Sequence, residues 1–463
     1  MKPKIMNLFT LMMVTAAFNI SIRNLGVLAK TGLEIFFFGF LALIIYYIPI
    51  AMVSAELATG WPKMGGIAIW VKEAFGKKFG LLAIWLQWVF MNIAVIAMLY
   101  FISGSLGYVY SADLINNKIY LICVILILIW TFTFLNLKGL KISTGISMTF
   151  FIIGVLIPAI LIISLGFYYV HSGKPIQLDT SFNFDNYFPS LHFSTLVILI
   201  GFMRTFGGIE GSAVHANNVL NPKRNFPIAI TFVVFLSFAI NILGSLSLAI
   251  VIPQDQINLL GGVMSAFTIY LEKYHLKALI PILSIFVAIG QTGGFSTWLA
   301  GPVRGLFETA LEGELPPFFQ KVNKNNMPIN LMILQAIIIS ITSTMFLLTS
   351  KNVNNSFWIT VALSMMVYVT MYFLMILSCL VLRYKKPEVE RTFRVPLIWL
   401  VSIIGLAAMV FAFVMALTPP VQLPNENHAA YVSTLVIFIT VIFAVPFIIH
   451  KFKKPSWNPN HKE

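Results

Sequence analysis

Arg204, Glu210 and three glycines lie in the middle of an apolar run, residues 193–219, that is long enough to cross a bilayer as a helix. A central arginine costs roughly 2.5–3.5 kcal/mol on membrane-insertion scales, and each glycine weakens a helix by roughly 1 kcal/mol relative to alanine. A broken helix around buried charge is tolerated where its backbone lines a cavity or is covered by other helices. This pattern is typical of a transport site near the middle of a membrane.

The first apolar run of the chain is interrupted in a similar way. Asn19, Ser21 and Arg23 break it, and it then resumes as far as Ala29. We interpret this run as a broken membrane helix rather than a signal peptide, because no small-x-small cleavage motif is evident. Matching breaks in the first and sixth apolar runs predict an inverted repeat with a shared site, in which half-helix amino ends bind a carboxylate.

The two breaks supply the backbone groups of the predicted site. For the amino acid substrate that the family resemblance described below implies, we expect the backbone of the first break to bind the α-carboxylate and carbonyl groups of the second to bind the ammonium group. The residues are Ile20, Ser21, Ile22 and Arg23 in the first break, and Phe206, Gly207 and Gly208 in the second. Glu210 has two interpretations, a carboxylate that exchanges protons during transport or the partner in a fixed ion pair with Arg23 or Arg204.

The other charged residues in apolar surroundings also have more than one possible role. Arg23 could bind a substrate carboxylate bidentately, pair with Glu210 or extend toward the membrane surface. Arg204 precedes the second break, where a gate or an ion pair is as well supported as ligand contact. Glu56 ends the second apolar run and is predicted to form an inner gate or a structural ion pair.

The composition assigns the whole chain to a membrane. Of its 463 residues 59% are hydrophobic and 10% charged, whereas about 25% of the residues of soluble domains are charged. A bilayer core needs roughly 20 apolar residues per helix, and the polar breaks divide the chain into twelve such runs. They are centred near residues 17, 46, 95, 127, 156, 206, 240, 294, 339, 370, 407 and 440.

The net charge of +14 follows the predicted topology and does not indicate nucleic-acid binding. If the N-terminus lies in the cytoplasm and the loops alternate, the inner segments hold 22 Lys and Arg and the outer loops six. This bias predicts that both termini are cytoplasmic. The two cysteines fall in apolar runs and are expected to be buried, with no disulfide or zinc spacing.

The remaining elements follow from composition and periodicity. We expect an interfacial helix at Ile67–Phe75, a helical cap within Ile257–Leu271, and a kink at Pro158 in the fifth helix, which would begin at about Ser143. The last two helices lack polar interruptions and are expected to be peripheral.

The sequence resembles the amino acid–polyamine–organocation transporter superfamily. The resemblance is carried by Gly208-Ile209-Glu210 and by the stretch Asn221-Pro222-Lys223-Arg224-Asn225-Phe226-Pro227-Ile228-Ala229. Within the superfamily the chain is most similar to the bacterial glutamate/γ-aminobutyrate antiporters. Four further stretches support this: His171–Pro175, Ile252–Leu259, Gly301–Gly305 and Val322–Pro328.

The resemblance implies a fold of five plus five inverted helices with two added, all in one transmembrane domain. The repeats would be residues 1–170 and 193–383, followed by the added pair at 395–450. Tyr368 and Tyr372, which share one helix face, match tyrosines near the family's substrate path, and Glu210 matches its helix-six carboxylate. Three features depart from the antiporters: Arg23 in place of a tyrosine, Gly294 in place of a carboxylate in the acid-resistance type, and a short tail.

These observations predict a secondary amino acid transporter, an antiporter for glutamate, γ-aminobutyrate or related amino acids in a bacterial inner membrane. A proton-coupled symporter for amino acids or amines and a membrane sensor that binds without transport are the alternatives. No enzymatic activity, cofactor or metal is expected. The partners would be the substrate, protons and lipid, and the protein would be a monomer or homodimer.

Overall fold

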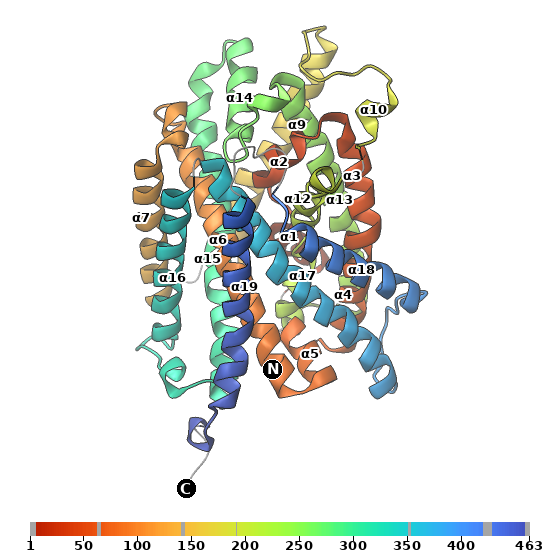
Figure 1. The fold of residues 1–463 in the computed structure, drawn as a ribbon, viewed down its shortest axis with the longest axis vertical. Helices are drawn as coiled ribbons and strands as arrows, with labels where there is room; N and C mark the ends of the chain where they lie inside the picture. The colour runs from red at the N-terminus through yellow and green to blue at the C-terminus, as the bar shows by residue number, and fades with distance from the viewer. Residues whose placement is uncertain are drawn as a thin grey trace.

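The computed structural model describes residues 6–62, 66–139, 144–190, 192–350, 353–419 and 428–458. Within these ranges the chain is helical, and β pairing is limited to isolated bridges between Met6 and Val219 and between Val322 and Pro328. Long helices run along the bundle axis, with α5 near one end and α10 and α14 near the other (Figure 1).

Within the described residues, the chain as far as residue 196 forms helices α1 to α11. They are α1 (Leu8–Asn19), α2 (Leu25–Ala29), α3 (Ile35–Ala42), α4 (Ile48–Gly60), α5 (Ile67–Phe75), α6 (Lys77–Gly107), α7 (Lys118–Leu137), α8 (Thr144–Phe151), α9 (Ile157–His171), α10 (Phe184–Tyr187) and α11 (Phe193–Leu196). The described residues after this point form helices α12 to α19. They are α12 (Leu199–Thr205), α13 (Pro222–Val251), α14 (Gly262–Lys273), α15 (Ile280–Leu311), α16 (Ile329–Thr349), α17 (Val353–Lys385), α18 (Ile398–Met415) and α19 (His428–Lys451).

Ten helical segments within the described residues are long and apolar enough to cross a membrane. They are Leu8–Ala29, Gly32–Gly60, Lys77–Gly107, Lys118–Leu137, Met148–His171, Pro222–Val251, Ile329–Thr349, Asn355–Lys385, Ile398–Met415 and His428–Lys451. The two other predicted runs correspond to the 32-residue α15 and to an interrupted segment, α11 and α12 followed by a 3₁₀ helix at Ile209–Asn218. The prediction of an all-α integral membrane fold is confirmed.

Helices at the centre of the bundle are buried by other helices, whereas the outer helices present apolar side chains that suit contact with lipid. The apolar window of α6 is 94% buried, whereas those of α7, α18 and α19 are 22–33% buried. Large apolar side chains such as Ile403 and Ile437 are exposed on the outer helices, as expected where lipid replaces water. The predicted peripheral position of the last two helices is confirmed. Cys123 on α7 is exposed, so the prediction that both cysteines are buried is wrong for this one.

The shorter predicted elements are largely present. The interfacial helix is α5, with the predicted bounds, and α14 forms the helical cap. The fifth helix contains a turn of π-helix at Ile152–Leu156, directly before the turn that carries Pro158. Its predicted start at Ser143 lies outside the described residues. A second π turn, at Leu43–Tyr47, was not predicted.

Both predicted helix breaks are present. The first helix stops at Asn19, and the chain is extended at Ile20 and Ser21 before a 3₁₀ turn leads into α2. The second break follows α12, and Gly208 adopts a φ of +106°, a conformation that strongly favours glycine. A Cβ atom at Gly208 would also meet the carbonyl oxygen of Phe18. The glycine therefore allows the two breaks to approach each other closely.

Candidate functional site

The two helix breaks are joined by the amide of Asn19. Its Nδ2 donates to the carbonyl oxygens of Phe206 and Gly207, each at 3.0 Å. Its Oδ1 accepts from the Tyr47 hydroxyl at 2.6 Å, and the Tyr47 ring stacks on Phe206 with centroids 4.9 Å apart. The Asn19 amide therefore donates to the same carbonyl oxygens that we predicted to accept from the substrate ammonium group. The Asn19 amide and a bound ammonium group would share these acceptors, or the ammonium group would replace the amide.

Asn19 and Tyr47 were not among the predicted site residues. Tyr47 lies in the π turn Leu43–Tyr47, together with Tyr46, and both tyrosines are fully buried. A π turn shifts the register of the side chains that follow, and such turns are frequent at functional sites. The adjacent tyrosines in an otherwise aliphatic segment are the sequence signal that could have identified this part of the site.

Glu210 is held by the tyrosine pair of α17. The carboxylate is 3% exposed. Tyr368 donates to its Oε1 at 2.9 Å, and Tyr372 donates to its Oε2. The Tyr372 hydroxyl also accepts from the Gly208 amide at 3.1 Å and lies 2.5 Å from the Tyr368 hydroxyl. The predicted tyrosine pair and the predicted carboxylate thus form one hydrogen-bonded cluster.

This cluster does not contain a fixed ion pair. Among the described residues, no arginine lies within ion-pair distance of Glu210. Arg204 is 6% exposed, donates from Nε to the Ser364 hydroxyl at 3.2 Å, and lies 5.0 Å from the centre of the Phe90 ring. Phe90 in turn stacks on Tyr368 at 3.9 Å. Arg204 therefore interacts with Glu210 through its electric field, beside an aromatic wall.

Arg23 carries a buried N–H group, at Nε, that lacks a hydrogen-bond partner in the described part of the chain. Its side chain is 4% exposed, so it does not extend to the surface. Arg23 and Arg204 are also close enough to repel each other electrostatically. The backbone N–H of Arg23 donates to the Ser21 hydroxyl at 3.2 Å, which stabilises the break around it.

The other predicted residues of the first break differ in how far their side chains are exposed. Ile20 and Ile22 are buried, while Ser21 is half-buried. Ser21 also faces Gln291 of α15, with 3.4 Å between the hydroxyl and Oε1. The break is thus bordered by α15 as well as by the second broken helix.

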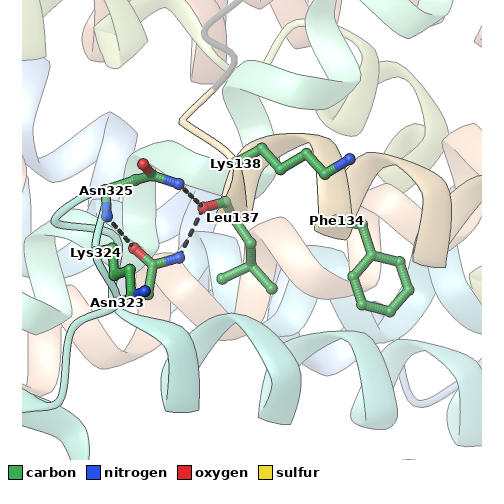
Figure 2. A pocket seen from close by; sticks show the side chains of 6 residues that line it. All are labelled: Phe134, Leu137, Lys138, Asn323, Lys324 and Asn325. Carbon is green, nitrogen blue, oxygen red and sulfur yellow. Dashed lines mark hydrogen bonds between the residues drawn. The ribbon is translucent and has the colours of Figure 1, made fainter.

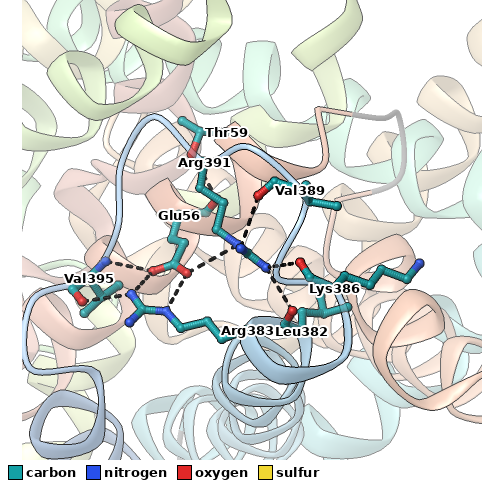
Figure 3. Close-up of polar contacts among 8 residues, drawn as sticks. All are labelled: Glu56, Thr59, Leu382, Arg383, Lys386, Val389, Arg391 and Val395. Atoms are coloured by element: carbon teal, nitrogen blue, oxygen red, sulfur yellow. Dashed lines mark hydrogen bonds and ion pairs between the residues drawn. The ribbon is translucent and has the colours of Figure 1, made fainter.

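Glu56 belongs to a separate ionic cluster with Arg383 and Arg391, which we call the Glu56 clamp (Figure 3). Its fully buried carboxylate accepts two hydrogen bonds from Arg383, at 2.8 and 2.5 Å, and one from the Val395 amide at 2.7 Å. Arg391 lies 3.6 Å from Glu56 and over the Trp61 ring. The clamp joins α4 to the end of α17 and to the segment that leads into α18.

The surface pocket of Figure 2 is not part of the candidate site. It lies at the end of α7, and the loop before α16 forms its other side. Asn323 and Asn325 donate to the Leu137 carbonyl at 2.7 and 3.1 Å, which caps the last turn of α7. None of the predicted site residues lines this pocket.

A membrane-spanning helical bundle in which two broken helices meet around buried charges defines a class of membrane transporters. The sequence matches the amino acid permease family over residues 6–445. The chain belongs to this family, which is part of the amino acid–polyamine–organocation superfamily. The family resemblance inferred from the sequence is confirmed.

The relatives described here cover 79–97% of this chain. An uncharacterized transporter of Legionella pneumophila is 34% identical, over 97% of this chain and 97% of its own. The glutamate/γ-aminobutyrate antiporter of Lactococcus lactis is 32% identical, over 97% of this chain and 91% of its own. A probable agmatine/putrescine antiporter of the same species is 22% identical, over 79% and 77%. The family and these relatives are transporters rather than enzymes, the relatives are bacterial, and this chain is a multi-pass membrane protein of that type.

The tyrosine cluster makes a first testable prediction. Replacing Tyr372 with phenylalanine removes the donor to Glu210 and the acceptor of the Gly208 amide, and we expect a loss of about 1–3 kcal/mol for buried groups left unpaired. Tyr120→Phe is the matched control, because the Tyr120 hydroxyl donates to the Ser103 carbonyl at 3.1 Å, outside this cluster. Thermal unfolding and substrate uptake of both variants would be measured. Equal effects of the two substitutions would contradict the assigned role of Tyr372.

The clamp makes a second prediction. Glu56→Gln leaves Arg383 and Arg391 without a buried counter-charge, and breaking a buried pair typically costs about 3–5 kcal/mol. We expect a large fall in thermal stability. Glu390→Gln is the control: this exposed carboxylate pairs with Lys223 at 2.5 Å, and that hydrogen bond and charge lower its pKa. Its pair should persist at neutral pH but contribute little in water. A Glu56→Gln protein as stable as Glu390→Gln would contradict the clamp.

Proposed function

We propose that this protein is an antiporter that exchanges glutamate for γ-aminobutyrate or a related amino acid by alternating access. The observation that carries the proposal is the buried Arg23 guanidinium, whose Nε has no partner within the described residues. A buried cation without a counter-ion is costly, and a substrate with an acidic side chain supplies the missing anion. The name of the Lactococcus lactis glutamate/γ-aminobutyrate antiporter, which is 32% identical to this chain, supports the same substrate pair.

The charge of the site supports an anionic substrate. Arg23, Arg204 and Glu210 give two buried positive charges and one carboxylate, so the site has an excess of positive charge when Glu210 is ionised. Glutamate carries one net negative charge near neutral pH, since both of its carboxylates are ionised and its amino group is protonated. The bound substrate therefore balances the charge of the site, which a neutral amino acid does not.

Glu210 is proposed to carry a proton in part of the cycle. Three contacts join the carboxylate and the hydroxyls of Tyr368 and Tyr372, but two hydroxyl groups supply only two hydrogens. A proton on Glu210 would supply the third. This favours proton movement together with amino acid transport, and it is the specific reason to test a proton-coupled symporter as the second candidate.

The proposed cycle assigns the remaining predicted residues to binding or to closure. The first break is proposed to bind the α-carboxylate and the carbonyls of the second break the ammonium group. Arg204 and the Glu56 clamp would act in gating. The two repeats, residues 1–170 and 193–383, would move relative to each other, with residues 395–450 as an added pair. The bias of Lys and Arg supports cytoplasmic termini.

The exchange reaction is tested with purified protein in liposomes. Each set of vesicles holds one unlabelled amino acid (glutamate, γ-aminobutyrate, glutamine or arginine), empty vesicles serve as control, and labelled glutamate is offered outside. Uptake that requires glutamate or γ-aminobutyrate inside is the expected result. Accumulation in empty vesicles under a proton gradient would contradict obligate exchange and support the symporter. Saturable binding without accumulation would indicate a sensor.

The role of Arg23 is tested in the same vesicles. Arg23→Ala should reduce glutamate transport by roughly tenfold to a hundredfold, the loss of a hydrogen bond to a charged group, and should affect γ-aminobutyrate much less. Arg304→Ala, at an exposed position of α15, is the control for loss of an arginine. Equal losses for both substrates would show that Arg23 has a structural role.

A further inference from the structure

Gln291 of α15 is a second buried group with unused hydrogen-bonding capacity beside the first helix break. Its side chain is 4% exposed, and within the described part of the chain its Nε2 has no hydrogen-bond partner. Its Oε1 faces the Ser21 hydroxyl at 3.4 Å. A buried donor left unpaired costs about 1–3 kcal/mol, so two such donors near one break, on Gln291 and Arg23, call for a common explanation.

The backbone of α15 fixes the position of Gln291. The preceding residue, Gly290, packs directly against Gly154, and a Cβ atom at either position would collide with the other backbone. Gly154 lies in the π turn Ile152–Leu156, which brings this part of the fifth helix against α15. Because the two backbones are in contact here, α15 cannot turn to give the Gln291 amide a different partner without separating the helices.

Ser21 links Gln291 to Arg23. Its hydroxyl accepts from the Arg23 backbone and faces the Gln291 amide. Ser21 is also half-buried, whereas Ile20, Ile22 and Arg23 are buried. Ser21 is therefore the least buried of these four residues, and it contacts both residues that carry unpaired donors.

We propose that Gln291 contacts the substrate and forms, with Arg23, the subsite for the side-chain carboxylate of an acidic amino acid. One carboxylate oxygen would accept from the guanidinium and the other from the Gln291 amide, which satisfies both buried donors at once. This inference rests on the proposed function and adds a specificity-determining residue to it.

The experiment measures transport by Gln291 variants in preloaded liposomes, with labelled glutamate and labelled γ-aminobutyrate in parallel. Gln291→Met keeps an unbranched side chain of similar length but has no amide. We expect its KM for glutamate to rise about tenfold or more, the loss of a hydrogen bond to a charged group, with little change for γ-aminobutyrate. Gln291→Glu places a carboxylate beside Arg23 and should abolish glutamate transport while retaining γ-aminobutyrate transport.

Thr292→Val is the matched control. The Thr292 hydroxyl bonds to the Ile289 carbonyl of its own helix at 2.7 Å, so its loss should leave both KM values unchanged. Equal losses for both substrates in Gln291→Met, with a normal melting temperature, would show that Gln291 only packs between helices and would overturn the inference. That result would leave the proposed function intact, provided that the wild-type protein exchanges glutamate for γ-aminobutyrate. A wild-type protein without exchange activity would contradict the proposed function itself. If Gln291→Met does not fold, the ratio of glutamate transport to γ-aminobutyrate transport is measured in Gln291→Glu. A ratio equal to that of the wild-type protein would overturn the inference.

Discussion

The site depends on the burial of two guanidinium groups with one carboxylate. Burial of an ion in a protein interior costs several kcal/mol unless it is paired. Arg204 has a hydroxyl partner and an aromatic wall, and Glu210 has two tyrosine hydroxyls. Arg23 lacks a side-chain partner at Nε among the described residues. The surrounding helices must therefore supply enough packing energy to hold this charge in place until a ligand balances it.

Two other sets of contacts make the arrangement possible. The Asn19 amide donates to the carbonyls of Phe206 and Gly207, and these hydrogen bonds hold the ends of the two broken helices together. In the Glu56 clamp one carboxylate pairs with both Arg383 and Arg391, so these charges are held by their own counter-ion, apart from the site. The Glu56 clamp, in which the carboxylate is hydrogen-bonded, holds helices together. The candidate site, in which Arg23 has an unpaired N–H group among the described residues, is suited to a charged ligand.

The sequence predicts the fold and the two breaks because charges and glycines in apolar runs are costly in a membrane. The spacing of Tyr368 and Tyr372 places them on one helix face, and the family resemblance implies that this face lies near the substrate path. The partners of Asn19 lie 187 and 188 positions away, and local pattern does not encode such contacts. The π turn that places Tyr47 and the backbone contact that fixes Gln291 depend on packing between helices. These residues therefore required the structure.

The most direct measurement is the thermal stabilisation of the purified protein by glutamate compared with glutamine at equal concentrations. The two ligands have nearly the same shape, and the side-chain carboxylate of one is an amide in the other. A ligand that binds the folded state stabilises it by RT ln(1 + [L]/Kd). We predict clear stabilisation by glutamate, much less by glutamine, and loss of the difference in Arg23→Ala. Equal stabilisation by both ligands, or none by glutamate, would contradict the account.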